Sequence, residues 1–297
     1  MNKSLPDFII VGAMKSGTST LHHILTQNDR VYIPPREIAF FDIDNIQQHN
    51  DFFVRSKDGW TFHDYESDFE NYLSWYESLF KEASEQTIIG DYSTTYMASE
   101  KAPERIKTLL PNVKLIFMLR NPVMRTYSHY WHLVRTNRAV YSFENTISNS
   151  PRNLLQRSFY KKQIERYKKY FSDQNMKFVL FEEFIQNMQP VVNDICGFIG
   201  LSGSIDVSKI DTHKNPGRYP RSTKMQLLSN RVFRGFMRKK RYRDTRPNMP
   251  PVKKSVLSRI LGLSLGAANK VNLTLEKSKP RMTEKTKRFL FKLMEKE

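Results

Sequence analysis

The sequence predicts an α/β protein with a P-loop-like three-layer fold, in which a central parallel sheet is flanked by helices. Short apolar runs with β-branched residues alternate with segments of helical length, as expected for a parallel sheet covered on both faces. The first apolar run also breaks into a glycine-containing loop directly before a helix, and such a loop is suited to bind an anion. The chain of 297 residues is long enough to bury a large core.

The first predicted strand and helix enclose the loop on which the functional interpretation depends. Residues 7–12 contain the apolar run 8–11 and are expected to form a buried strand, and residues 18–27 are expected to form a helix. Gly12 and Gly17 allow the close backbone turns that an anion-binding loop needs. The free amides at the helix start favour a phosphate or phosphosulfate group as the ligand. The loop residues expected to bind it are Lys15, Ser16, Gly17, Thr18, Ser19 and Thr20.

The order of residues in this loop differs from that of a nucleoside triphosphatase. Lys15 precedes Gly17, whereas the triphosphatase loop has its lysine directly after the second glycine, followed by a serine or threonine. The chain therefore lacks the arrangement that supplies a magnesium ligand and a contact to a γ-phosphate. We expect metal-free binding of a 5′-phosphate group.

The alternation of strands and helices continues beyond the first helix. Glu37 lies in the loop that follows the first strand and helix, and residues 52–80 form a long aromatic segment that is expected to be mostly helical near its end. The other predicted elements are strands at 87–90, 113–119 and 177–181 and helices at 101–110, 122–136, 151–171 and 188–199.

A second anion-binding element is predicted after the strand at 113–119. Arg120 follows this strand, and Pro122 is well placed in the first turn of the next helix. In an open α/β sheet, ligands bind at the carboxyl ends of the strands, and a guanidinium can hold two phosphate oxygens at once. Ser128 lies two helical turns further on and could donate its hydroxyl to the same phosphate. The alternative is an arginine that caps the sheet edge and a serine on a solvated helix face.

Four segments together resemble the sulfotransferases that depend on 3′-phosphoadenylyl sulfate (PAPS). They are the strand, Lys-Ser-Gly-Thr and helix of residues 9–21, the Arg-Glu-x-x-Phe-Phe element of 36–41, the strand and Asn-Pro helix of 113–128, and the late strand of 177–184. They follow the family's order and cover roughly residues 5–221. The sequence is most similar to the heparan-sulfate or glycan branch and its bacterial homologues. A catalytic core over residues 1–221 is therefore expected.

The resemblance implies transfer of the sulfuryl group from PAPS to a hydroxyl or amine of a glycan or glycolipid by in-line displacement. Glu37 would be the base, and Lys15 would stabilise charge on the departing 3′-phosphoadenosine 5′-phosphate (PAP). Arg120 and Ser128 would bind the 3′-phosphate. Residues 213–221 resemble the late loop that closes over the 3′-phosphate and adenine, and this loop carries Lys214, Arg218 and Arg221. From the residues alone, without the resemblance, a lone glutamate in a loop is more typical of a surface carboxylate, here paired with Arg36.

A histidine offers a second candidate for the base. His132 lies one helical turn beyond Ser128, and an N-sulfating branch of the family carries a histidine at this position. It would assist the base or orient the acceptor. His22, His23 and His129 are expected to be packing or solvated residues. Tyr92 stands where the glycan branch often has a second lysine, so the catalytic duty of that lysine is in doubt here.

Positive charge is concentrated in the last part of the chain. Residues 214–297 hold 24 of the 48 Lys and Arg residues but 5 of the 30 Asp and Glu residues, within a net charge of +18. Residues 222–297 are expected to form a basic, mainly helical extension that packs on the core or trails from it. The extension could attract an anionic acceptor, contact an anionic membrane surface, or be a solvated face.

The remaining features bear on compartment and on other classes of function. Cys196 is the single cysteine, and no secretory leader or long apolar run is present, so a cytoplasmic location with possible peripheral membrane contact is expected. A P-loop nucleotide or nucleoside kinase would share the first strand, loop and helix but needs a lysine after Gly17 and a magnesium carboxylate. A nucleic-acid-binding protein is suggested by net charge alone, and the balanced charge of residues 1–213 argues against it.

Overall fold

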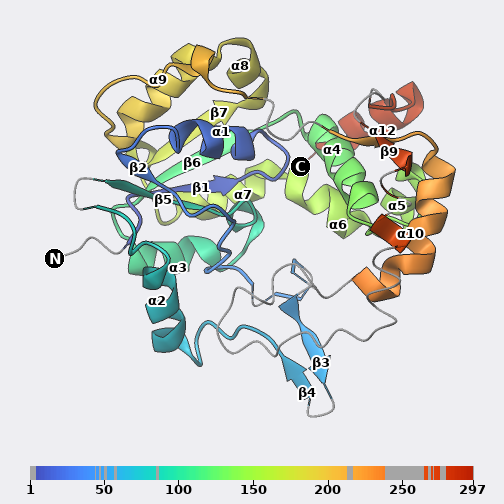
Figure 1. Cartoon of the computed structure of the whole chain (residues 1–297), viewed down its shortest axis with the longest axis horizontal. Coiled ribbons are helices and arrows are strands. Elements are labelled where there is room, and N and C mark those ends of the chain that lie inside the picture. Colours follow the sequence, from blue (N-terminus) through green and yellow to red (C-terminus); the bar gives the residue numbers. More distant parts are fainter. Residues whose placement is uncertain are drawn as a thin grey trace.

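The computed structural model describes residues 5–43, 45–46, 48–49, 52–56, 59–84, 87–212, 217–237, 264–266, 269, 271–274 and 279–296. At its centre, a five-stranded parallel sheet has the strand order β2-β5-β1-β6-β7. These strands are β1 (Phe8–Gly12), β2 (Val31–Tyr32), β5 (Ile88–Tyr92), β6 (Lys114–Leu119) and β7 (Met176–Leu180). Helices lie on both faces of the sheet (Figure 1), so the predicted three-layer α/β fold is confirmed.

The two faces of the sheet bury two hydrophobic clusters because successive strand residues point to opposite sides. Ile9 and Val11 of β1 belong to one cluster, and Phe8 and Ile10 belong to the other. The first cluster is completed by α2 (Phe69–Ser78), α3 (Ala102–Leu109) and α7 (Tyr160–Lys168), and the second by α1 (Thr18–Leu25) and α9 (Met188–Ile199). Figure 1 shows α1 and α9 above the sheet and α2 and α3 below it.

The predicted strands are all present, and their ends agree with the structure to within two residues. The same holds for the helices predicted at 18–27, 101–110, 122–136 and 188–199. The aromatic segment is helical near its end, as α2, and an antiparallel hairpin precedes it. The sequence did not predict β2, this hairpin of β3 (Val54–Ser56) and β4 (Gly59–Thr61), α5 (Phe143–Asn149) or α8 (Phe181–Gln186), nor the short strands near the end of the chain.

The single helix predicted over residues 151–171 is wrong, because a buried arginine from α4 occupies a break in it. The segment folds as α6 (Pro151–Leu155), a 3-10 turn (Gln156–Ser158) and α7. Arg125 is fully buried, and its guanidinium donates to the Leu154 carbonyl and to Ser158 Oγ. A buried charge needs such acceptors, and a continuous helix would have used the Leu154 carbonyl internally.

The last described segments pack beside α4 (Pro122–Arg135), at one end of the sheet in Figure 1. Buried Leu290 belongs to the same hydrophobic cluster as Val123 and Tyr127 of α4. The buried amide of Asn230 donates to the Val134 carbonyl at 3.0 Å. These segments are α10 (Thr223–Met237), α12 (Glu284–Met294) and the antiparallel pair β8 (Tyr219–Pro220) and β9 (Leu273–Thr274). The division of the chain into residues 1–221 and 222–297 stays a prediction.

Candidate active site

The loop between β1 and α1 has the backbone of a tight anion-binding turn. Gly17, directly before α1, has φ 86°, and Lys15 has φ 72°, so both residues lie in the left-handed region. A Cβ atom at Gly17 would lie 2.9 Å from Cδ2 of Phe181, so the position favours glycine for space as well as for conformation. Ser16 and Thr18 are buried, and Ser19 and Thr20 are more exposed on the first turn of α1. The first amides of α1 therefore start at the carboxyl end of β1.

Arg120 joins the two predicted phosphate elements directly. It follows β6, and its Nη1 donates to the Lys15 carbonyl at 3.1 Å. The guanidinium carbon lies 4.4 Å from the centroid of the Phe181 ring, and the Tyr160 hydroxyl donates to the Arg120 carbonyl at 3.1 Å. Nε of Arg120 is buried and has no hydrogen-bond partner within the described part of the chain. The guanidinium is thus fixed beside the loop with a donor left for a ligand.

The site concentrates positive charge. Burial and the nearby charges of Arg135 and Arg120 lower the pKa of Lys15 to about 8, although Glu37 opposes this shift. Burial likewise lowers the pKa of Arg120. Cations that repel one another in this way are stabilised by an anion placed between them. The charge of the site therefore favours an anionic ligand.

The α4 residues predicted for the site differ in exposure. Ser128 and His132 are partly exposed, whereas His129 is buried. Burial lowers the pKa of His129 well below its ordinary value, and the charges of Arg125 and neighbouring cations act in the same direction, so this imidazole is neutral. The centroids of the His129 and His132 rings lie 6.4 Å apart. His132 consequently remains a candidate to orient the acceptor, while His129 belongs to the interior.

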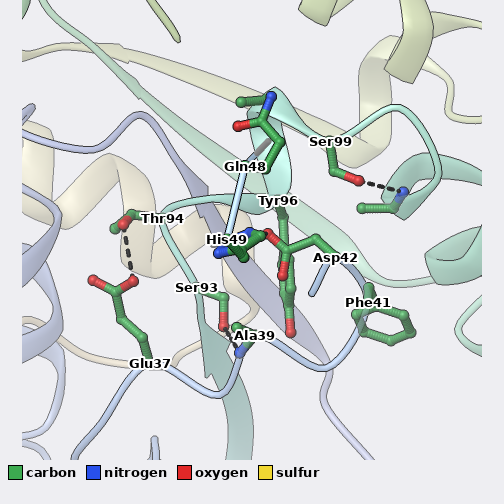
Figure 2. A network of polar contacts seen from close by, with 12 residues as sticks. Glu37, Ala39, Phe41, Asp42, Gln48, His49, Ser93, Thr94, Tyr96 and Ser99 are labelled. Atoms are coloured by element: carbon green, nitrogen blue, oxygen red, sulfur yellow. Dashed lines mark hydrogen bonds and ion pairs between the residues drawn. The ribbon is translucent and has the colours of Figure 1, made fainter. Parts of the chain in front are cut away.

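The Glu37 carboxylate is held in place by a hydroxyl. Thr94 Oγ1 donates to Glu37 Oε2 at 3.0 Å (Figure 2). Burial raises the pKa of Glu37, and the bonds from Thr94 oppose this shift. Arg36, beside it in the sequence, is exposed. A carboxylate with a raised pKa and one fixed oxygen suits a general base.

Tyr92 connects Glu37 to the phosphate loop. Its hydroxyl lies 2.7 Å from Ser19 Oγ, with either atom as the donor. Burial raises the pKa of Tyr92, and the negative charge of Glu37 raises it further, so the phenol stays protonated. The residue that replaces the lysine of the glycan branch therefore offers hydrogen bonds and no positive charge.

A buried polar network, which the sequence did not predict, has Asp91 of β5 at its centre. Asp91 Oδ2 accepts from the hydroxyls of Tyr76 and Tyr96, each at 2.9 Å, and Oδ1 accepts from Ser93 Oγ at 3.0 Å. Burial raises the pKa of Asp91 to about 6, and these three hydroxyls oppose the shift. Each hydroxyl of the network also has an oxygen that can accept a further hydrogen bond.

The Asp91 network fixes the backbone that follows Glu37. Ser93 Oγ accepts from the amides of Ile38, at 3.1 Å, and Ala39, at 2.9 Å. The Tyr96 hydroxyl accepts from the amide of Phe40 at 2.8 Å. Three successive amides after Glu37 are thus bonded to side chains that lie just after β5, and Figure 2 shows the bond between Ser93 and Ala39. The sequence signal was available, because Asp91, Ser93 and Tyr96 directly follow a predicted strand, where site residues gather.

A second pair, Asp42 and His49, lies beside this network. His49 Nε2 is 2.9 Å from Asp42 Oδ2 (Figure 2). Burial raises the pKa of Asp42, but the charge and hydrogen bond of His49 outweigh burial and lower it. Arg157 donates to the Gln48 carbonyl at 2.9 Å and to Met14 Sδ at 3.4 Å, which links this segment to the phosphate loop. No pattern in the sequence indicates these long-range contacts.

The late loop is described only in part. Lys214 lies outside the described residues. Arg218 and Arg221 are exposed, while Tyr219 between them packs edge-on against Trp131 of α4, with ring centroids 5.7 Å apart. The structure therefore places the tyrosine against α4, whereas both arginine side chains are exposed.

Comparisons with known proteins agree with this geometry. A profile described as the sulfotransferase family matches residues 6–204, about two thirds of the chain. The chain belongs to the sulfotransferase family. The matched residues of this sulfotransferase-family protein include Lys15, Glu37, Arg120 and Ser128 and stop before the late loop. The predicted family is confirmed.

Its curated relatives include enzymes named for heparan sulfate. Heparan sulfate glucosamine 3-O-sulfotransferase 5 of Mus musculus is 26% identical over 247 residues, which cover 78% of this chain and 64% of the relative. The bifunctional heparan sulfate N-deacetylase/N-sulfotransferase 1 of Caenorhabditis elegans is 26% identical over 216 residues, which cover 67% of this chain and 22% of the relative. The chain thus spans less than two thirds of the length of these relatives.

One solved structure is also similar. The sulfotransferase from Alicyclobacillus acidocaldarius has a TM-score of 0.57 and 27% sequence identity, and the match covers 80% of this chain and 94% of that one. The similarity supports both the fold and the family.

Proposed function

We propose that this protein transfers the sulfuryl group of PAPS to a hydroxyl or amine of a carbohydrate acceptor, and that the acceptor is a glycan or glycolipid. The observation that carries the proposal is the bond between Arg120 Nη1 and the Lys15 carbonyl, because it joins the two predicted phosphate elements into one cation-rich site. Glu37, with a raised pKa, interacts electrostatically with Lys15 in the same site. An anionic donor and a base are the two requirements of sulfuryl transfer.

The residues present fit PAPS as the donor. The lowered pKa of Lys15, its repulsion by Arg120, and the unpartnered Nε of Arg120 all indicate that a bound anion would be stabilised here. The amides at the start of α1, with Ser16, Thr18, Ser19 and Thr20, would hold the 5′-phosphosulfate. Arg120 and Ser128 would hold the 3′-phosphate. When bound, PAPS supplies the sulfuryl group and PAP as the leaving group.

Each residue then has a distinct task in the reaction. The Glu37 carboxylate takes the proton from the acceptor as the acceptor oxygen or nitrogen forms its bond to sulfur. The sulfur–oxygen bond to PAP breaks on the opposite side, and the Lys15 ammonium stabilises the charge that develops on that oxygen. Thr94 keeps one Glu37 oxygen fixed, and His132 orients the acceptor.

The carbohydrate acceptor is supported by the relatives whose names include heparan sulfate, at 26% identity. The phosphate-binding residues do not distinguish O-sulfation from N-sulfation, and the relatives' names contain both. A cytoplasmic location with peripheral membrane contact stays a prediction. Along the described residues, we find no helix with the length and hydropathy to cross a membrane.

A transfer assay tests the proposal. The purified chain is incubated with radiolabelled PAPS and a panel of acceptors: unsulfated heparosan, N-acetylated heparan sulfate, a neutral glycolipid and a simple phenol. We expect label on one of the carbohydrate acceptors, no label with Glu37→Gln, and normal transfer with the exposed control Glu104→Gln. Label on the phenol alone would contradict the carbohydrate acceptor. Binding of ATP with magnesium and none of PAP would favour the kinase.

A further inference from the structure

Helix α10 turns apolar side chains outward and polar side chains inward. Met225, Leu228 and Val232, which we call the outer stripe, share one face of the helix and are 66%, 62% and 60% exposed. Gln226 and Asn230 share the other face and are buried. A helix on a protein surface usually packs its apolar face on the core. The outer stripe is therefore not explained by packing within the described part of the chain.

Hydrogen-bonded amides fix α10 in this orientation. Asn230 Nδ2 donates to the carbonyls of Val134, at 3.0 Å, and Ala139, at 2.8 Å. Gln226 Nε2 donates to Asn230 Oδ1 at 3.0 Å and to Asn269 Oδ1 at 2.8 Å. Buried amides that lost these partners would destabilise the fold. Rotation of α10 to bury the outer stripe is disfavoured for this reason.

Cations and an aromatic ring lie beside the outer stripe. Lys224 and Arg231 are exposed, and each lies within about one helical turn of Leu228. The Arg231 guanidinium carbon is 5.8 Å from the centroid of the Tyr141 ring, which is 44% exposed. Among the described elements, α10 lies at the outer edge of the molecule, at right in Figure 1. This surface thus combines exposed apolar side chains with positive charge.

Charge determines which partner suits this surface. Residues 214–297 carry 24 Lys and Arg residues against 5 Asp and Glu residues. A second copy of the chain would oppose these cations with its own, because a two-fold interface places the same surface on both sides. A soluble polyanion would pair with the cations but leave the outer stripe in water. An anionic lipid surface suits both, since its acyl boundary takes apolar side chains and its headgroups attract cations.

We propose that α10 docks this protein on an anionic lipid surface. The outer stripe enters the boundary between headgroups and acyl chains, and Lys224 and Arg231 pair with lipid phosphates. The buried amides of Gln226 and Asn230 hold the helix in the orientation that this contact needs. The proposal goes beyond sulfuryl transfer and does not depend on the identity of the acceptor.

Flotation of the full-length protein with lipid vesicles tests the proposal. Vesicles of phosphatidylcholine alone are compared with vesicles that also contain about 30% phosphatidylserine. We expect the wild type to bind the anionic vesicles and to leave the neutral ones largely unoccupied. The double variant Leu228→Gln, Val232→Gln should bind the anionic vesicles at least tenfold more weakly, because insertion of the apolar side chains is lost.

Matched variants separate the apolar contribution from the charge. Ile185→Gln removes an apolar side chain that is 53% exposed on α8, and it should change binding by less than about twofold. Lys224→Gln should weaken binding about fivefold, whereas Lys81→Gln, at an exposed position outside residues 214–297, should leave it unchanged. Thermal unfolding checks that each variant is folded, and sulfuryl transfer to a soluble acceptor should be the same in all of them.

A fluorescent reporter tests insertion directly. Cys196 is buried, so an environment-sensitive dye can be attached selectively to Leu228→Cys or to the control Ile185→Cys. We expect the emission to shift to the blue on anionic vesicles with the first protein and to stay unchanged with the second.

Three results would overturn the proposal and leave the proposed function standing. One is the absence of wild-type binding to anionic vesicles. Another is equal binding by the wild type and the double variant, which would mean that charge alone attracts the protein. The third is a wild-type dimer that the double variant converts to monomers in sedimentation velocity, because a second copy would then cover the outer stripe.

Discussion

The two sides of the site are built in opposite ways. On the side of Lys15 and Arg120, like charges lie close together, and burial and the charges of Arg135 and Arg120 lower the pKa of Lys15. On the side of Glu37, hydroxyls and amides are paired through Asp91, so that the backbone after the base is fixed. The cationic side becomes favourable when an anion binds, whereas the carboxylate side is complete without a ligand. The comparison indicates that donor binding and base positioning can be disturbed separately.

This difference has an energetic basis. A buried donor that loses its partner costs about 1–3 kcal/mol, so the paired amides after Glu37 resist displacement. The repulsion between buried cations is instead offset by the ligand, and a shift of one pKa unit corresponds to about 1.4 kcal/mol. Variants on the two sides should therefore differ in which measured quantity they change.

Removal of the base should have the largest effect. Glu37→Gln keeps the shape of the side chain but cannot accept a proton, so kcat should fall by roughly 10³-fold with the Kd for PAP unchanged. Steady-state transfer assays and calorimetry measure the two quantities. Near-normal turnover would contradict the assignment and make His132 the next candidate for the base.

Removal of Lys15 should have the next largest effect, and it should change both the rate of transfer and the affinity for PAP. Lys15→Ala should lower kcat/KM by about 10²-fold, because stabilisation of the leaving group is lost, and should weaken PAP binding about tenfold. Lys81→Ala, at an exposed position, is the matched control. If donor affinity fell as much with Lys81→Ala, general charge would explain the effect and the specific role of Lys15 would be wrong.

Disruption of the buried network should lower stability and affect only the base. Ser93→Ala leaves the amides of Ile38 and Ala39 without their acceptor, so the free energy of unfolding should fall by about 3 kcal/mol. A displaced Glu37 should lower kcat roughly tenfold at unchanged PAP affinity. Exposed Ser148→Ala serves as the control, with a change below about 0.5 kcal/mol. A PAP affinity that fell in parallel with kcat would show that the two sides are not independent.

The pH dependence of kcat/KM should show one ionisation from each side of the site, each with a smaller effect than the substitutions above. Glu37 must be deprotonated to act, and its pKa is raised by burial, so kcat/KM should fall on the acid side below that raised pKa. Lys15 must be protonated to bind the donor, so kcat/KM should also fall as pH rises through about 8. A bell-shaped profile is expected, and Glu37→Gln should leave the alkaline loss of PAP affinity in place. PAP affinity that stays constant from pH 7 to pH 9.5 would contradict the cationic side of the account.

The sequence predicted the elements whose signal is local. The apolar strands around Phe8 and residues 114–119, the loop at Lys15 and the helix start at Pro122 depend on neighbours in the chain, and the structure has them in place. The broken helix at 156–158 was missed because its cause, buried Arg125, comes from another helix. The pair of Asp42 and His49 was missed for the same reason, because tertiary contacts alone bring it beside the site.

Titration of PAP and adenosine 5′-phosphate into the wild type, Lys15→Ala and Arg120→Ala is the most direct test of a nucleotide site between these two cations. We expect saturable PAP binding by the wild type, weakened at least tenfold by either substitution. Adenosine 5′-phosphate should lose affinity with Lys15→Ala and keep most of it with Arg120→Ala. No saturable binding of PAP, or equal losses for both nucleotides with Arg120→Ala, would contradict the account.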